Sequence, residues 1–148
     1  MAASEPAPAP GDPAHEGPIV AELEIRNLIA RLAHLADHGD LEEYVLLFTE
    51  DASWEFPGGP RRGRADILAG ATERRTQGLT GPGSASRHVI TTLAVQVHDD
   101  TTATADSYWM FWRDTDTAPA VFNMGHYHDT VRRERGTWRL AQREITLG

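Results

Sequence analysis

The chain has 148 residues, a length typical of one domain that can build its own hydrophobic core. It contains neither cysteine nor lysine, which excludes disulfides, thiolate metal sites, cysteine nucleophiles and Schiff-base lysines. The formal net charge of −8 disfavours contact with nucleic acid or anionic lipid, and no apolar run approaches the roughly 20 residues of a membrane-spanning helix. We therefore expect a cytoplasmic protein without nucleic-acid or membrane partners.

Residues 1–17 are rich in alanine and proline, a composition typical of a disordered tail, and they show no features of a secretion signal. We expect a single folded domain over residues 18–148. Its first helix should begin at Pro18, because proline suits the first helical turn, and should end at Gly39. An apolar stripe at helical spacing defines the buried side of this helix. The stripe consists of Ile25, Leu28, Ile29, Leu32, Leu35 and Ala36.

A short second helix is expected after Asp40, which can act as its N-cap with Glu43 three residues later. Its buried side is formed by Leu41, Tyr44, Val45 and Phe48. The next elements are a strand (52–56), a turn (57–60), a third helix (64–77) and a flexible loop (78–86).

The second half of the chain is dominated by β-branched, aromatic and alternating runs, separated by short turns. The four predicted strands are 89–97, 102–112, 120–132 and 138–145. Helices followed by strands indicate an α+β fold, with the helices packed on one face of an antiparallel meander. Such a sheet, if it curls around the helices, leaves a cavity lined by inward-facing side chains.

Five different segments, spread over residues 19–146, are informative because of their order and spacing. They are Ala36-Asp37-His38-Gly39-Asp40, residues 44–52 (YVLLFTEDA), Arg87-His88-Val89-Ile90, residues 125–129 (GHYHD) and residues 138–143 (WRLAQR). In this order and spacing the chain resembles the SnoaL-like branch of the NTF2-like (cystatin-like) superfamily, which includes scytalone dehydratase and ketosteroid isomerase. The resemblance implies a cone-shaped domain that works without cofactor or metal, on a fold that hosts dehydratases, isomerases, cyclases, epoxide hydrolases and binding-only subunits.

The resemblance also implies site residues. Asp37 matches the helix-end aspartate of scytalone dehydratase, and His88 matches its strand-opening histidine. Phe56 and Ala36 stand where that enzyme has pocket tyrosines, and its second catalytic histidine aligns near Tyr108 or Trp109. These departures favour a substrate other than scytalone, bound beside an Asp–His unit in an aromatic pocket.

His88 is the candidate general base and acid, because an imidazole titrates near working pH. Asp37 is the candidate group that orients it, since a carboxylate bonded to one ring nitrogen leaves the other free to take a proton. The alternative for His88 is a partly buried histidine bonded to the backbone. The alternative for Asp37 is a solvated helix end, and its burial is implied only by the resemblance.

His126 and His128 share one strand face, opposite Tyr127 and Asp129. We expect one of these histidines to point into the cavity and donate a hydrogen bond to a substrate oxygen. The alternative is a metal site that combines both with His88, completed by a carboxylate such as Asp37 or Asp106. Asp129 is expected to pair with Arg139 or Arg143 on the next strand.

Aromatic side chains supply the rest of the expected pocket, although alternation alone does not say whether Trp109 and Phe111, or Tyr108, Met110 and Trp112, face inward. The predicted substrate-binding set is Tyr44, Trp54, Phe56, Tyr108, Met110, His126 and His128. An aromatic set on the outside of the sheet would favour a homodimer.

Together these residues predict a cofactor-independent lyase or isomerase that acts on a small, apolar, oxygenated ring compound. One alternative is a non-catalytic binding or assembly subunit, in which His88 would turn away from the cavity or bond only to backbone. Another is an epoxide hydrolase, which would need a second acid beside Asp37, with Asp106 as the available choice.

Overall fold

The computed structural model describes residues 13–148, and this part of the chain folds into three helices and one six-stranded sheet. In chain order the elements are α1 (Pro13–His38), α2 (Leu41–Leu46), β1 (Phe48–Glu55), β2 (Arg61–Arg62), α3 (Gly63–Thr76), β3 (Arg87–Val97), β4 (Thr102–Arg113), β5 (Ala120–Glu134) and β6 (Thr137–Leu147). The expected α+β class is confirmed.

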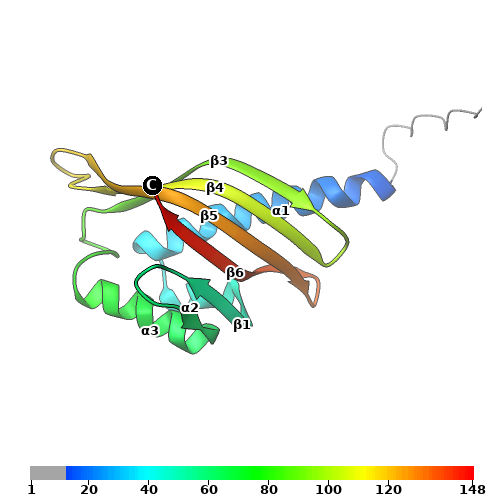
Figure 1. Ribbon diagram of the computed structural model, residues 1–148, viewed down its shortest axis with the longest axis horizontal. Helices are drawn as coiled ribbons and strands as arrows, with labels where there is room; N and C mark the ends of the chain where they lie inside the picture. Colours follow the sequence, from blue (N-terminus) through cyan, green and yellow to red (C-terminus); the bar gives the residue numbers. More distant parts are fainter. Residues whose placement is uncertain (1–12) are drawn as a thin grey trace, which may run out of the picture.

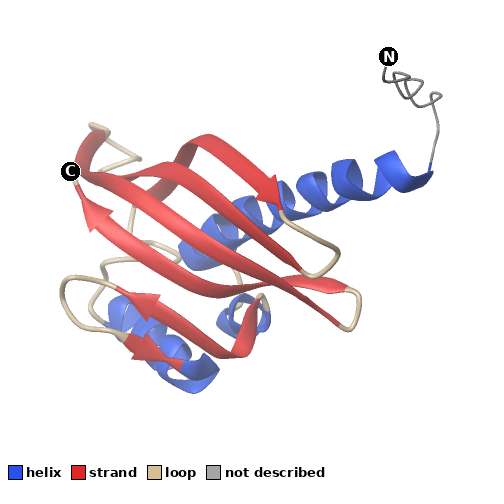
Figure 2. Ribbon diagram, turned by 45° about the vertical axis from the view of Figure 1, so that its right-hand side comes forward, coloured by secondary structure: helices blue, strands red, loops and turns tan. Residues whose placement is uncertain are grey.

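The sheet has the strand order β2-β1-β6-β5-β4-β3, in which β3 to β6 form the predicted antiparallel meander. β1 pairs in parallel with β6, and the short β2 pairs antiparallel with β1. α1 crosses one face of the sheet, where it contacts β3 and β6, while α2 and α3 pack beside β1 (Figures 1 and 2). We call this side the helix-covered face and the opposite side the outer face.

The apolar stripe of α1 packs into the core as the helical spacing predicts, with Ile25, Leu28, Ile29 and Leu32 all buried. The helix begins at Pro13 rather than Pro18, so that Pro13 takes the first helical position, which proline suits, and Pro18 lies inside the helix. Residues 1–12 of the expected tail lie outside the described residues. No helix within residues 13–148 has the length and apolarity needed to cross a bilayer.

The ends of the short elements differ from the expected bounds by a few residues. Asp40 caps α2 as predicted, because its Oδ1 accepts from the backbone N–H groups of Glu42 and Glu43. β1 starts at Phe48, four residues early, since the parallel pairing with β6 extends to Leu140.

Candidate active site

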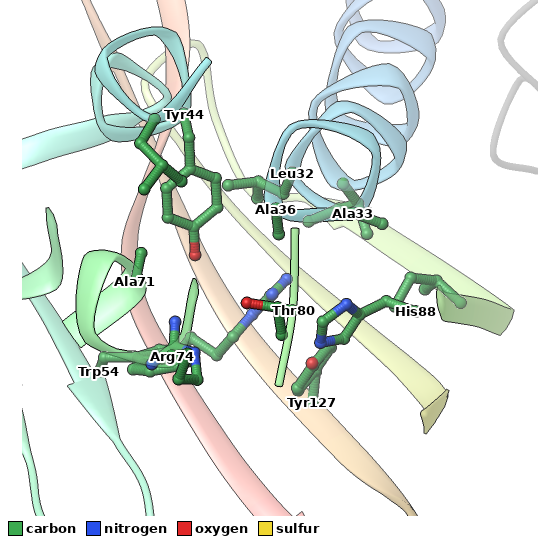
Figure 3. A pocket seen from close by; sticks show the side chains of 14 residues that line it. Leu32, Ala33, Ala36, Tyr44, Trp54, Ala71, Arg74, Thr80, His88 and Tyr127 are labelled. Atoms are coloured by element: carbon green, nitrogen blue, oxygen red, sulfur yellow. The ribbon is translucent and has the colours of Figure 1, made fainter. Parts of the chain in front are cut away.

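A cavity with an inner and an outer compartment lies between the helices and the sheet. The inner compartment has a volume of about 50 Å³ and the outer one about 320 Å³. The residues that line both compartments are Trp54, Arg74, Thr80, His88 and Tyr127. Because they come from β1, α3, the loop before β3, β3 and β5, distant parts of the chain meet at one place (Figure 3).

The walls of the cavity are mostly apolar, and they include several residues of the predicted substrate-binding set. Tyr44 lines the inner compartment, Phe56 lines the outer one, and Trp54 lines both. α1 closes the inner compartment with small and branched side chains, whereas Trp109 and Phe111 of β4 line the outer one. A small apolar ring therefore fits the outer compartment.

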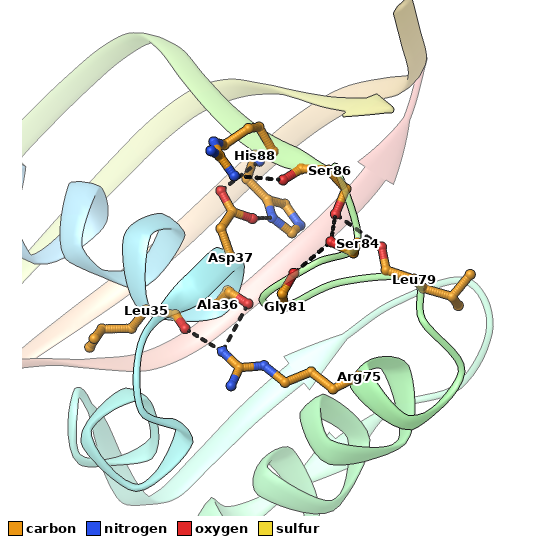
Figure 4. A network of polar contacts seen from close by, with 10 residues as sticks. Leu35, Ala36, Asp37, Arg75, Leu79, Gly81, Ser84, Ser86 and His88 are labelled. Atoms are coloured by element: carbon orange, nitrogen blue, oxygen red, sulfur yellow. Dashed lines mark hydrogen bonds and ion pairs between the residues drawn. The ribbon is translucent and has the colours of Figure 1, made fainter. Parts of the chain in front are cut away.

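Asp37 and His88 form a hydrogen-bonded pair at the edge of this cavity (Figure 4). The Asp37 Oδ1 atom lies 2.6 Å from the His88 Nδ1 atom, and the Asp37 Oδ2 atom accepts from the His88 backbone N–H at 2.9 Å. The Asp37 side chain is only 3% exposed, because the last turn of α1 packs against the start of β3. The carboxylate thus fixes both the position and the tautomer of the imidazole.

The other ring nitrogen of His88, Nε2, makes no hydrogen bond with any residue that the structure describes. The His88 ring lies against Phe111, with 4.8 Å between the ring centres, and the side chain lines both compartments. With Nδ1 held by Asp37, Nε2 is left to accept a proton from a bound molecule.

Hydrogen bonds of Ser84 and Ser86 hold the loop between α3 and β3, just before His88 in the chain. The Ser86 hydroxyl donates to the Leu79 carbonyl, and the Ser84 hydroxyl donates to the Gly81 carbonyl, at 3.1 and 2.7 Å (Figure 4). The two serine hydroxyls lie 2.7 Å apart, and because each has a single proton, a hydrogen bond between them takes the place of one of the two bonds to carbonyls. This ordered loop places the start of β3 opposite Asp37.

Arg75 fixes the other side of the same junction. One guanidinium nitrogen of Arg75 donates to the carbonyls of Leu35, Ala36 and Gly39, which lie at the end of α1. Carbonyls at a helix end lack partners within the helix, so this contact satisfies them and joins α3 to the turn that carries Asp37.

Two tyrosine hydroxyls add hydrogen-bond donors to the inner compartment. Tyr44 and Tyr127 both line it, and neither hydroxyl bonds to another described side chain or backbone group. Burial raises the pKa of Tyr127 to about 12 and also raises the pKa of Tyr44. Both phenols therefore stay protonated at neutral pH and can donate to a substrate oxygen.

Beneath Tyr127 lies a fully buried ion pair between β5 and β6. Arg143 donates through Nε and Nη2 to the two carboxylate oxygens of Asp129, each at 2.7 Å. Its guanidinium lies 3.9 Å from the centre of the Tyr127 ring. The expected pairing of Asp129 with the next strand is confirmed, with Arg143 as the partner.

Four members of the predicted set lie away from the cavity. Tyr108, Met110, His126 and His128 are on the outer face, so their prediction as cavity residues is wrong. Strand alternation is the reason: Trp109 on β4 and Tyr127 on β5 face the helices, so their neighbours face outward.

The outer-face histidines instead share one carboxylate. Asp106 Oδ1 lies 3.1 Å from His126 Nε2 and 2.7 Å from His128 Nδ1. The hydrogen bond with Asp106 raises the pKa of His128, and the same bond lowers the pKa of Asp106. The alternative metal site is not formed, because His88 lies on the opposite side of the sheet, and the part of the chain described here holds no other three-residue set suited to a metal.

Sequence reasoning missed several residues of the cavity, of which Arg74 is the most important. It follows Ile67 and Ala71 on α3 by seven and three residues, so it lies on the buried side of that helix. That spacing was visible in the sequence. Thr80 and Arg143 were not assigned to the pocket either, whereas Trp109 and Phe111 were left open as one of two alternative inward-facing sets; all four line the cavity in the structure.

Comparison with known proteins agrees with this architecture. The profile of the SnoaL-like domain matches residues 19–144. No curated protein matches the chain significantly. An NTF2-like protein with a cystatin-like fold from Novosphingobium aromaticivorans is 29% identical, with a TM-score of 0.78 over 94% of this chain and 92% of that one.

Two further solved structures share the fold. A protein of unknown function from Mycobacterium tuberculosis is 27% identical, with a TM-score of 0.80 over 95% of this chain and 78% of that one. A candidate scytalone dehydratase from Novosphingobium aromaticivorans is 18% identical, with a TM-score of 0.72 over 90% of this chain and 88% of that one. Since the family profile spans nearly the whole described domain, the chain belongs to the SnoaL-like domain family and has its NTF2-like, cystatin-like fold.

Proposed function

We propose that this protein is a cofactor-independent lyase or isomerase that transfers protons on a small, apolar, oxygenated ring compound. The observation that carries the proposal is the Asp37–His88 pair, whose free Nε2 lies at a cavity with apolar walls. A histidine held in one tautomer by a buried carboxylate is suited to general acid–base catalysis.

In this mechanism His88 Nε2 removes a proton from a carbon next to a carbonyl, and Asp37 stabilises the resulting imidazolium. The electron pair moves onto the carbonyl oxygen, where the hydroxyls of Tyr44 and Tyr127 donate hydrogen bonds to the developing charge. The imidazolium then returns its proton, either to a departing hydroxyl in a dehydration or to another carbon in an isomerisation. A positioned general base of this kind typically contributes about 10²–10⁴-fold.

The geometry favours this function over both alternatives. A binding-only subunit was expected to bond His88 to backbone alone or to turn it away, whereas His88 bonds the Asp37 side chain and lines the cavity. An epoxide hydrolase was expected to need Asp106 beside Asp37, and Asp106 lies on the outer face. No carboxylate is among the described residues that line the two compartments.

Exchange of α-protons for deuterium tests the proposal without knowledge of the natural substrate. The probe is 2-tetralone, a bicyclic ketone with acidic α-protons, incubated with the protein in D₂O and followed by mass spectrometry. We expect the wild-type protein to accelerate exchange, and His88→Gln to lower the enzymatic rate by about 10²-fold or more. The matched control is His126→Gln on the outer face, which should exchange like the wild type. Equal rates for His88→Gln and the wild type would remove the proposal.

We further propose that the protein forms a homodimer through the outer face. Tyr108 and Met124 are each about half exposed there, and Tyr108 lies directly opposite His126 on the neighbouring strand. Exposed apolar side chains on one sheet face are typical of contact surfaces. Light scattering coupled to size exclusion should give a dimer mass for the wild type and a monomer mass for Tyr108→Glu; a monomeric wild type contradicts this assignment.

A further inference from the structure

Two arginines that line the cavity, Arg113 and Arg74, have no ion-pair partner among the described residues, and of the two only Arg74 lines both compartments. Its guanidinium makes no hydrogen bond and no ion pair with any residue between 13 and 148. By contrast, Arg143 is bound to Asp129, Arg75 to three carbonyls, and Arg61 to two carboxylates.

The position of Arg74 is nevertheless well defined. Its guanidinium carbon lies 4.7 Å from the centre of the Trp54 ring, and its side chain points into the cavity beside Tyr44 and Thr80 (Figure 3). Burial is the main cause that lowers the pKa of Arg74. The guanidinium is only partly shielded from water and is not held in an ion pair, so it can bind an anion without first losing a contact to a carboxylate of the protein.

The cavity as a whole is positively charged, although the protein is strongly acidic. Apart from Tyr44 and Tyr127, the charged or titratable side chains among the described lining residues are Arg74, Arg113, Arg143 and His88, and no aspartate or glutamate is among them. Asp129 neutralises Arg143, which leaves Arg74 in both compartments and Arg113 in the outer one. This local excess stands against a formal net charge of −8 for the whole chain, and it attracts anions.

We propose that Arg74 binds an anionic oxygen of the substrate, a carboxylate or the oxyanion of an acidic enol or phenol, carried on an otherwise apolar ring. Arg74 and His88 line the same two compartments, so an anion held by the guanidinium leaves the attached ring beside His88 Nε2. Trp54, Trp109 and Phe111 provide the apolar surface for that ring. The inference rests on the proposed function for the identity of the site, and it adds the charge of the substrate.

A matched pair of probes tests the charge directly. Both 2-naphthoate and 2-naphthamide carry the same bicyclic ring, and only the first is an anion. Isothermal titration calorimetry should show tighter binding of naphthoate by the wild type. Arg74→Met should weaken naphthoate binding by about tenfold to a hundredfold, since a hydrogen bond to a charged group contributes that much, and should leave naphthamide binding unchanged. Arg74→Lys keeps the charge but not the planar guanidinium, so its affinity for naphthoate should lie between those of the wild type and Arg74→Met.

The control is Arg31→Met, which removes an exposed arginine of α1 outside both compartments and should change neither affinity. The proposal is overturned if the wild type fails to bind naphthoate, or if it binds the two probes equally. It is also overturned if Arg74→Met weakens both probes alike, because the residue would then act only on pocket shape. These are equilibrium measurements, so the anion preference should persist in His88→Gln even where proton exchange is lost, which separates this inference from the proposed reaction.

Discussion

Replacement of Asp37 by alanine provides a quantitative test of the buried pair. The substitution removes a carboxylate that accepts two hydrogen bonds from His88, one of them from a backbone N–H at 2.9 Å. Hydrogen bonds to charged groups contribute about 1.5–3 kcal/mol each, and an unsatisfied buried N–H costs about 1–3 kcal/mol. Since the released imidazole can reach the solvent of the cavity, we expect a net loss of roughly 2–4 kcal/mol in the free energy of unfolding.

Urea denaturation followed by tryptophan fluorescence measures this loss as a shift of the midpoint. Asp37→Asn keeps an acceptor for the backbone N–H, so it should lose less stability than Asp37→Ala. The control is Asp100→Ala in an exposed turn, which should stay within about 0.5 kcal/mol of the wild type. If Asp37→Ala is as stable as this control, the reasoning about the pair is refuted.

Three further predictions concern other parts of the molecule. Asp40→Ala removes the N-cap of α2 and should lower stability by about 1 kcal/mol in the same urea assay; no change would show that the cap is dispensable. NMR titration should give His128 a pKa above 6.5, and Asp106→Asn should return it towards that value. Folding raises the pKa of His128 and lowers that of Asp106, so the pair should stabilise the protein at pH values between these two pKa values. This contribution should be lost as the pH rises through the pKa of His128. Identical pH profiles of the free energy of unfolding for the wild type and Asp106→Asn would contradict this. Ultraviolet titration should show one tyrosine ionisation near pH 12, and this step should be absent in Tyr127→Phe. Complete ionisation of all tyrosines by pH 11 would contradict the burial of this phenol.

The elements of the fold were largely readable from the sequence, because each depends on local patterns. The α1 stripe follows the helical period, the Asp40 cap lies at the start of α2, and the four long strands are β-branched runs bounded by turns. The parallel pairing of β1 with β6 joins distant parts of the chain, and because of it β1 begins at Phe48 rather than at the predicted residue 52.

The inward face of the meander was not readable in the same way. Alternation divides the side chains of β5 into two sets but does not say which set is buried. The set with His126 and His128 was predicted to face the cavity because histidines can transfer protons. The buried set contains Asp129, which is accommodated only because Arg143 lies directly opposite it on β6. The charge of Asp129 therefore does not prevent this set from being buried, because a residue on the next strand compensates it.

In the candidate site, too, local patterns predicted less than contacts between distant residues. Asp37 and His88 lie 51 positions apart in the chain, and the resemblance to a known family, rather than helical periodicity, brought them together in prediction. Arg74 could have been found from its spacing to Ile67 and Ala71, but its lack of a partner is visible only when every neighbouring carboxylate has been placed.

The tautomer of His88 tests the central claim most directly. Long-range ¹H–¹⁵N correlation spectra of the neutral imidazole distinguish a proton on Nδ1 from a proton on Nε2. We predict the Nδ1–H form in the wild-type protein, held by the 2.6 Å contact with Asp37, and a switch to the Nε2–H form in Asp37→Asn. A wild-type spectrum with the proton on Nε2 would contradict the account, because the nitrogen that faces the cavity could then not act as a base.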